Sequence, residues 1–446
     1  MTAESTPAQD LRARVQQALD QARQRGATAA AVSLECGGGL TVAVRLGELE
    51  TVEHEQDQGL SITAYFGHRR GHASSTDLRA DSVARTVEAA CQIARSTEED
   101  PCHGLPDEER LAFEYPDLDL HHPRDIDSDE AARLALECEN AARADSRIVN
   151  SEGAEVRRYD GIRVLGNSLG FMGTYRRSSH DLGCCVVAAD GDGAQERDYW
   201  HSAHCDWRKV QDPETVGRIA AERTVRRLGA RPLASCVAPV LFEAPVARSL
   251  LGHFAGAASG RALYNEASFL LGRMNEQVWA RDIRLVERPR EVGGVASAPF
   301  DAEGVETQER VVVDGGVLRG WFLSSYSARR LGLVSTGNAG GVRNLSLETR
   351  ASALSWEELL QRLGRGLVVT ELMGQGVNQV TGDYSRGAAG FWVEDGVPVH
   401  PVHEITIAGS LPDMYCGIVA VGAEQDCRGS LQTGALLIDQ MQIAGV

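Results

Sequence analysis

Apolar and polar residues follow two different periods in the first half of the chain. Apolar residues recur at helical spacing from Leu11 to Ala22 and stop before Gly26, which predicts an amphipathic helix. The same spacing predicts helices at about 77–94, 127–144 and 212–229, and alternation predicts strands at 31–35, 41–45, 59–66 and within 148–199. Helices and strands are therefore mixed along this half.

The second half is dominated by short apolar segments separated by glycine turns. Residues 311–323, around Asp-Gly-Gly, and residues 390–402, around Glu-Asp-Gly, are typical of β-hairpins. Helices are predicted at 245–258 and 355–363, and the second opens with a capping box.

The change of pattern predicts an α+β protein with two domains. A mixed α/β domain is expected over residues 1–230 and a β-rich domain with a few helices over residues 231–446. Arg231-Pro232 and Pro239 interrupt the pattern between them. A chain of 446 residues is also too long for one ordinary core.

Charge narrows the classes of partner. The net charge of −18 is spread along the chain, and an acidic surface repels phosphate backbones, so no nucleic-acid partner is expected. Lys209 is the single lysine, which excludes a P-loop and leaves one candidate for a Schiff base.

Targeting signals and cysteine pattern both favour the cytoplasm. The first ten residues are polar and acidic, so no signal peptide is expected, and no run of about 18 apolar residues predicts a membrane span. The ten cysteines form no C-x-x-C pair, which is typical of reduced thiols in a cytoplasmic protein.

Two local patterns suggest catalytic chemistry, and each has an ordinary structural interpretation. Gly166-Asn167-Ser168-Leu169-Gly170 matches G-x-S-x-G, but it lies between two strand-like segments, whereas the nucleophile elbow joins a strand to a helix. A simple turn is therefore favoured.

His201, His204, Cys205 and Asp206 form the densest group of possible metal ligands. His201 and His204 would point to opposite faces of one strand, which argues against joint coordination. No H-E-x-x-H pattern of a metalloprotease helix occurs.

Three polar glycine-rich segments, 336–344, 372–378 and 381–390, follow strands in the second half. Glycine permits close backbone approach, which suits docking of an extended peptide through main-chain hydrogen bonds. Tight β-turns in a compact domain explain the pattern equally well. The candidate contacts with a peptide or a protein partner are Asn338, Gly340, Gly341, Gly382, Asp383 and Tyr384.

Longer motifs carry a family resemblance that covers nearly the whole chain. They are SSTDL (74–78), PFDAEGV (299–305), SSYSAR (324–329), TELMGQG (370–376), GDYSRGAAGFW (382–392) and EITIAG (404–409). Together they resemble the PmbA/TldE branch of the TldD/PmbA metalloprotease family.

The resemblance implies a cytoplasmic heterodimer that degrades or processes unfolded peptides. In this family the TldD-type subunit carries H-E-x-x-x-H on a helix, and a cysteine near its C-terminus completes the zinc site. The expected partner is therefore a TldD-type subunit that holds the zinc, and a homodimer is possible when this chain is isolated. An older family name refers to modulation of DNA gyrase, whereas the acidic charge argues against DNA contact.

The chain departs from the catalytic pattern at the metal helix. LLGHFAGA (250–257) resembles that segment, with Gly252 and Ala257 at the ligand positions and His253 at the position of the general base. Glycine and alanine offer no lone pair to a cation, so no catalytic residue and no metal are expected in this chain. Two alternatives remain open: a stand-alone metallopeptidase that uses His201, His204 and Cys205, and a regulatory protein that binds a gyrase-type target.

Overall fold

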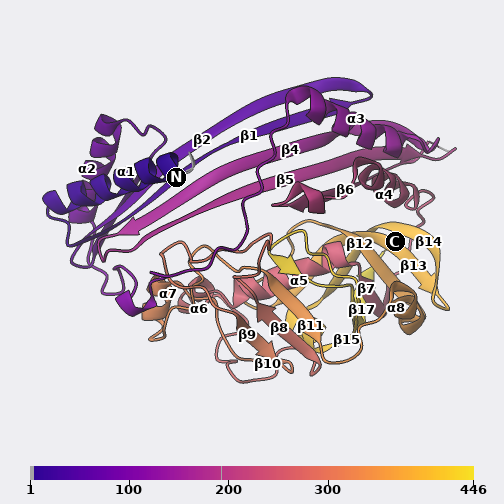
Figure 1. Ribbon diagram of the computed structural model, residues 1–446. Helices are drawn as coiled ribbons and strands as arrows, with labels where there is room; N and C mark the ends of the chain where they lie inside the picture. Colours follow the sequence, from indigo (N-terminus) through magenta and orange to yellow (C-terminus); the bar gives the residue numbers. More distant parts are fainter. Residues whose placement is uncertain (1–4, 192, 446) are drawn as a thin grey trace.

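A computed structural model describes residues 5–191 and 193–445 (Figure 1). The first half forms one antiparallel sheet of long strands in the order β3-β2-β1-β4-β5-β6. Its strands are β1 Ala29–Arg45, β2 Glu48–Phe66, β3 Arg69–Ser75, β4 Ile148–Asn167, β5 Met172–Ala189 and β6 Gln195–His204.

Helices cover one face of this sheet. The helices α1 Ser5–Gln24 and α2 Ala80–Ser96 pack at one end, and α3 Ser128–Arg143 and α4 Pro213–Val225 pack at the other (Figure 1). Alternate strand residues such as Val32 and Val42 point into these two helix-covered cores, so their neighbours in the strand point to the opposite face. That opposite face looks toward the second half of the chain.

Local chemistry sets the helix starts. As the sequence predicts, the carboxylates of Asp127 and Asp212 accept hydrogen bonds from the backbone N–H groups of Glu130 and Thr215, at 2.8 and 2.9 Å.

Two predicted strand boundaries are wrong. Residues 31–35 and 41–45 belong to one strand, β1, because Gly37, Gly38 and Gly39 pair with β2 on one side and β4 on the other. Strand β2 begins at Glu48, 11 residues before the predicted start, because its first part is exposed and carries no apolar alternation.

The second half contains two further sheets. Strands β14, β13, β12, β7 and β17 pair in this order, and a pairing of β14 with β17 closes the sheet, while β15 adds to β17. The other sheet has the order β10-β9-β8-β11-β16. The predicted hairpins are confirmed as β9–β10 and β13–β14.

The elements of this half are β7 Cys236–Phe242, α5 Ala244–Ala257, α6 Gly260–Tyr264, β8 Ile283–Glu287, β9 Arg310–Asp314, β10 Val317–Leu318, α7 Ser325–Arg330, β11 Leu345–Thr349, α8 Trp356–Leu363, β12 Gly366–Met373, β13 Asp383–Glu394, β14 Val397–Ser410, α9 Leu411–Cys416, β15 Ile418–Val421, β16 Leu431–Gln432 and β17 Leu436–Ala444. Helix α8 opens with the predicted capping box of Ser355 and Glu358. Short 3-10 turns lie at Glu108–Arg110 and Trp207–Lys209.

A connector, residues 97–127 between α2 and α3, ties the two halves together. Leu111 forms a β-bridge with Val305, and the Tyr326 hydroxyl donates to the Asp100 carboxylate at 2.8 Å. Nearby, the rings of Tyr115 and Phe300 pack edge to face, with centroids 5.1 Å apart.

A largely buried network of ion pairs makes a second junction between the halves. Arg223 bridges Asp198 and Glu243, both at 3.2 Å, and Arg227 reaches Glu196 at 3.1 Å and Glu371 at 2.5 Å. Since Glu243 and Glu371 belong to the second half, the region around the end of α4 is fixed to it.

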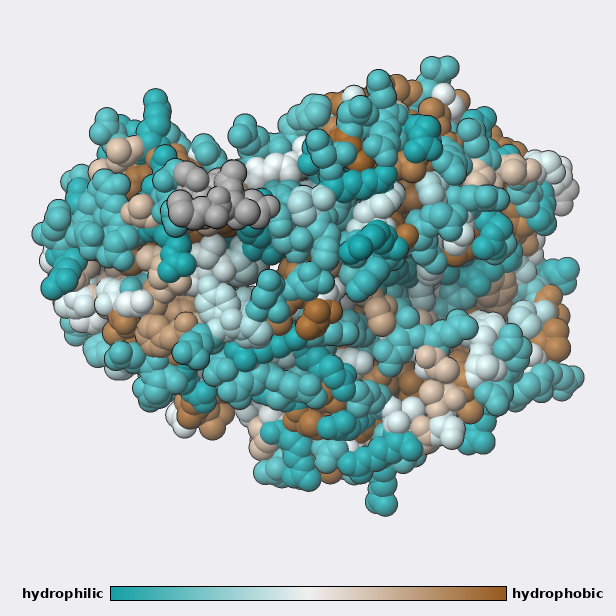
Figure 2. Space-filling view, in the orientation of Figure 1, coloured by the Kyte–Doolittle hydropathy of each residue, from teal (hydrophilic) through white to brown (hydrophobic). Residues whose placement is uncertain are grey.

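The α+β class, with a mixed first half and a β-rich second half, is confirmed. The boundary at residue 230 stays a prediction. The face in Figure 2 is mainly hydrophilic, with hydrophobic residues in small groups. Over residues 5–191 and 193–445, none of the helices has the length and apolar character that a membrane crossing requires.

Candidate functional site

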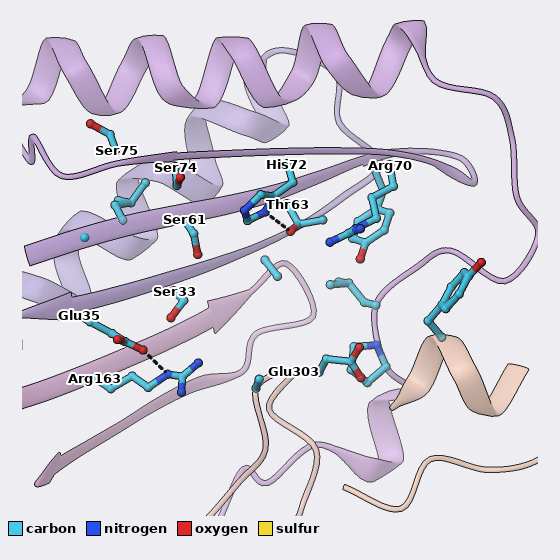
Figure 3. A pocket seen from close by; sticks show the side chains of 18 of the residues that line it. Ser33, Glu35, Ser61, Thr63, Arg70, His72, Ser74, Ser75, Arg163 and Glu303 are labelled. Carbon is cyan, nitrogen blue, oxygen red and sulfur yellow. Dashed lines mark hydrogen bonds and ion pairs between the residues drawn. The ribbon is translucent and has the colours of Figure 1, made fainter. Parts of the chain in front are cut away.

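The helix-free face of the first sheet borders a cavity of about 1280 Å³ (Figure 3). Strands β1, β2 and β3 form one wall, and the connector and the second half supply the opposite side. The lining includes Ser33, Glu35, Ser61, Thr63, Arg70, His72, Ser74, Arg163, His103, Tyr264, Glu303 and Tyr326.

Hydroxyl groups form a row across this wall. Ser33 is paired with Ser61, and Ser61 with Ser74, so the three side chains lie side by side on one face (Figure 3). No hydrogen bond to another described residue engages their hydroxyls, which leaves them available to a ligand or to water. In the next row, Thr63 Oγ1 lies 3.1 Å from His72 Nδ1.

Charged groups of both signs lie at the edges of the hydroxyl row. Glu35 and Arg163 form an ion pair at 3.1 Å, and a Glu303 oxygen accepts a hydrogen bond from the backbone of Ser325 at 2.9 Å. Burial and then the nearby Arg70 lower the pKa of His72, so its ring is neutral at pH 7. The wall can therefore donate and accept hydrogen bonds along a polar ligand.

The Tyr159 side chain lies on the sheet surface at the rim of the cavity. A methyl group on Gly37 would lie 2.2 Å from the Tyr159 hydroxyl, and one on Gly161 would lie 2.8 Å from its ring. Glycine in these two strands therefore makes room for the ring. Burial, followed by the charges of Asp57 and Glu35, raises the pKa of Tyr159.

Helix α5 contains the positions that the sequence predicts to be a degenerate metal helix. The methyl group of Ala257 is fully buried, and Gly252 presents only hydrogen. His253 is half-buried, its ring centroid lies 6.1 Å from that of Tyr384, and its Nε2 has no hydrogen-bond partner among the described residues.

These residues do not fit a zinc ion, which needs three or four nitrogen, sulfur or oxygen ligands. Burial and then Arg386 lower the pKa of His253, which keeps its imidazole neutral. Over residues 5–191 and 193–445, no group of three or more His, Cys, Asp or Glu side chains is arranged to hold a metal ion.

The first glycine loop is anchored from inside. Asn338 is 7 % exposed, and its amide donates to Glu287 and accepts from Arg310, at 2.7 and 2.8 Å. Gly340 and Gly341 have φ angles of +94° and +103°, which glycine adopts without strain. Gly340 borders a second, smaller cavity.

The second predicted contact segment lies near α5. Gly382 has a φ angle of +83°, the Asp383 carboxylate accepts from the Thr381 hydroxyl at 2.6 Å, and Tyr384 is 1 % exposed. Contact of either segment with a peptide or a protein partner stays a prediction.

Ser168 and Cys205, two of the remaining sequence candidates, make hydrogen bonds to backbone groups of distant segments. The G-x-S-x-G segment is a turn between β4 and β5, as predicted, and the Ser168 hydroxyl accepts from the backbone of Ala30 at 3.0 Å. His201 and His204 both lie in β6, and the Cys205 thiol contacts the carbonyl of Gly293 at 3.4 Å.

Sequence reasoning assigned no role to the cavity wall. The sequence nevertheless contained an indication of it, because three of the family motifs contribute the lining residues Ser74, Glu303 and Tyr326. The alternation of Ser61 and Thr63 with buried Leu60 and Ile62 also indicated a polar sheet face.

Family models match most of the chain in three segments. They are described as PmbA/TldA metallopeptidase domain 1 (residues 30–94), the central domain (121–228) and the C-terminal domain (235–445).

Similar proteins span almost the full chain. A metalloprotease PmbA of Escherichia coli O157:H7 is 48% identical, with 91% of this chain and 90% of that protein covered, and a PmbA homologue of Haemophilus influenzae is 44% identical, with 98% and 96% covered. A Bacteroides thetaiotaomicron protein named for modulation of DNA gyrase has the same fold, with a TM-score of 0.91, 24% identity and coverage of 97% and 98%. TldE of Thermococcus kodakarensis also shares it, with a TM-score of 0.82, 20% identity and coverage of 97% and 100%.

Proposed function

The chain belongs to the PmbA/TldA metallopeptidase family, and we propose that it is a PmbA/TldE-type subunit without a zinc site of its own. It pairs with a TldD-type chain that holds the zinc. The pair acts in the cytoplasm on unfolded peptides, and this chain supplies part of the chamber in which they bind.

The side chains of α5 carry the proposal of a non-catalytic role. Hydrogen at Gly252 and a buried methyl at Ala257 stand where coordination would need lone pairs. A larger group at residue 257 would enter the packed core that also contains Leu250 and Phe254. This helix therefore serves packing, and the chemistry belongs to the partner.

The cavity supports the peptide-binding part of the proposal. Its hydroxyl row, Ser33, Ser61 and Ser74, offers donors and acceptors that suit the main chain of any peptide. Such recognition selects extended peptides over folded proteins, in which most main-chain groups are already paired.

The test is co-expression with a TldD-type chain from the same organism. We expect a stable complex with peptidase activity on an unfolded peptide, about one zinc per heterodimer, and almost no zinc in this chain alone. His253→Ala in this chain should leave the activity of the complex within about twofold, a change worth roughly 0.4 kcal/mol.

Near-stoichiometric zinc in the isolated chain, lost together with peptidase activity after His204→Ala, would overturn the proposal in favour of a stand-alone metallopeptidase. The absence of any complex with the TldD-type chain would overturn the partnership.

The role of the cavity has its own test. Ser61→Trp fills the wall and should raise the KM of the complex for peptide about tenfold, equivalent to roughly 1.4 kcal/mol of binding. Ser352→Trp, at an exposed serine away from the cavity, is the control and should leave KM unchanged. An unchanged KM in both variants would exclude the cavity from peptide binding.

A further inference from the structure

A second cavity, of about 400 Å³, lies between the first sheet and the first glycine loop. Strands β5 and β6 contribute Arg177, Ser179 and His204, and the loop contributes Gly340, Val342 and Arg343. Positive side chains gather here in a chain whose net charge is −18.

Arg177 has no counter-charge. It is half-buried, and over residues 5–191 and 193–445 it makes neither a hydrogen bond nor an ion pair with another residue. Burial, together with the positive charge of Arg343, lowers its pKa. Its neighbour Arg176 points to the opposite face and is paired with Asp160 at 3.4 Å.

Among the residues that the structure describes, no carboxylate forms an ion pair with the Arg343 guanidinium either. Its guanidinium donates only to backbone carbonyls of the glycine loop, those of Gly337, Ala339 and Gly341, at 3.2–3.5 Å. Two guanidinium groups therefore border one cavity with their charges uncompensated, which favours an anionic ligand.

Neutral donors complete the lining. His204 Nδ1 accepts from the backbone N–H of Asp206 at 2.9 Å, so the proton of the neutral ring is placed on Nε2. Burial and the nearby Lys209 lower the pKa of His204, which keeps the ring in this neutral, donating form.

Both cavities lie on the same face of the sheet. Arg177 is paired with Gly161, and Arg163 with Tyr175, two positions along the same strands. Residues in such rows share a face, and Arg163 lines the first cavity. The ring of Tyr159, over Gly161, lies at the rim between them.

We propose that the cavity lined by Arg177, Arg343 and His204 binds a carboxylate, namely the free C-terminal carboxylate of a peptide that extends along the sheet face from the first cavity. This inference rests on the proposed peptide-binding function. Planar guanidinium groups match the two oxygens of a carboxylate, and His204 borders the same cavity as a neutral side chain. The site would make the chain sensitive to the end of a peptide as well as to its extended form.

The test compares one unfolded peptide in two forms, with a free C-terminal carboxylate and with a C-terminal amide. Binding to the purified chain is measured by calorimetry, and we expect the free acid to bind at least about tenfold more tightly. Arg177→Gln should abolish this difference. Arg176→Gln, which removes a charge from the opposite face of the same strand, should preserve it.

Equal affinity for acid and amide would overturn the inference, and so would inorganic phosphate that binds this site more tightly than the peptide acid. An active heterodimer without discrimination between the two peptide forms would refute the carboxylate site and leave the proposed function intact. If the chain binds the free acid more tightly than the amide but forms no active complex, the carboxylate site would stand and the proposed function would be refuted.

The thermal stability of the Arg177→Gln variant distinguishes a binding role of Arg177 from a structural one. Because Arg177 is half-buried and unpaired, Arg177→Gln should leave the thermal midpoint of the unliganded chain unchanged or raised. A midpoint lowered by several degrees would show that Arg177 holds the fold together, and it would overturn the assignment.

Discussion

Burial and nearby arginines lower the pKa of three histidines, His72, His201 and His253. His201 in β6 is the clearest case, because burial, with Arg428 and Arg248 nearby, lowers its pKa from 6.5 to about 4. Its backbone carbonyl also accepts from Arg428 at 3.0 Å. The side chain is therefore neutral in the folded protein and protonated more readily in the unfolded chain.

This difference predicts a pH dependence of stability. Between pH 6.5 and 4 the unfolded chain binds the proton that the folded chain rejects, so the contribution of His201 is fully present above pH 6.5 and lost as the pH falls toward 4. It amounts to about 1.5 kcal/mol, roughly half of the full shift because the ring is only partly buried. His201→Gln should flatten the decrease in unfolding free energy over this window, measured by urea denaturation at several pH values. An identical slope in both proteins would contradict the prediction.

At the scale of single residues, the sequence predicted contacts between neighbours in the chain better than contacts between distant segments. The caps at Asp127 and Asp212 could be predicted because donor and acceptor lie three residues apart. The meeting of Ser33 and Ser74 with Glu303 could not, because it depends on how the two halves of the chain pack. The unpaired state of Arg177 could not be predicted either, since the sequence does not show which carboxylates lie near a given arginine in the folded chain.

At the scale of elements, close approach between α3 and α4 depends on one glycine. A methyl group on Gly217 would lie 2.0 Å from the carbonyl oxygen of Cys138 and 3.0 Å from the Ala141 methyl. Gly217→Ala should therefore force the helices apart and lower the unfolding free energy by about 2–3 kcal/mol. Chemical denaturation followed by circular dichroism would measure it.

Gly252 in α5 is the matched control. A methyl group there would meet only the end of the Leu431 side chain, at 3.3 Å, and that side chain can adjust. Gly252→Ala should be neutral or stabilising by up to about 1 kcal/mol, because alanine favours a helix. Equal destabilisation by both substitutions would show that helix spacing is not the cause at Gly217.

Elements differ in how well the sequence foretold them. The hairpins β9–β10 and β13–β14 carry their turn residues and were predicted correctly. The length of β1 was not, because Gly37, Gly38 and Gly39 indicate a break unless both neighbouring strands are known. Pairing on both sides supplied the hydrogen bonds that overrode the low strand preference of glycine.

At the scale of the whole molecule, the buried ion pairs at the end of α4 join the two halves. Arg227→Met would remove the cation beside the buried Glu196 and Asp198 and the half-buried Glu371, and Glu196 would keep only His403, at 3.3 Å. Loss of a cation beside buried carboxylates is costly. We expect a loss of about 3 kcal/mol in the free energy of unfolding, measured by urea denaturation.

Arg218→Met on the same side of the molecule is the control. Arg218 pairs with Glu222 at 2.7 Å, but both side chains are more than half exposed. Its replacement should cost less than about 0.5 kcal/mol. A similar loss in both variants would mean that the charge removed, rather than the buried junction, matters.

The closed sheet of the second half has a consequence for biosynthesis. All six strands of the first sheet have been synthesised by residue 204, so this sheet can assemble while translation continues. One edge of strand β7 pairs with β17, at residues 436–444. This edge therefore cannot be paired until almost 200 further residues have left the ribosome. During that interval the apolar side chains and the unpaired edge of β7 are exposed to solvent. We therefore expect chaperones to matter most while the second half is being synthesised.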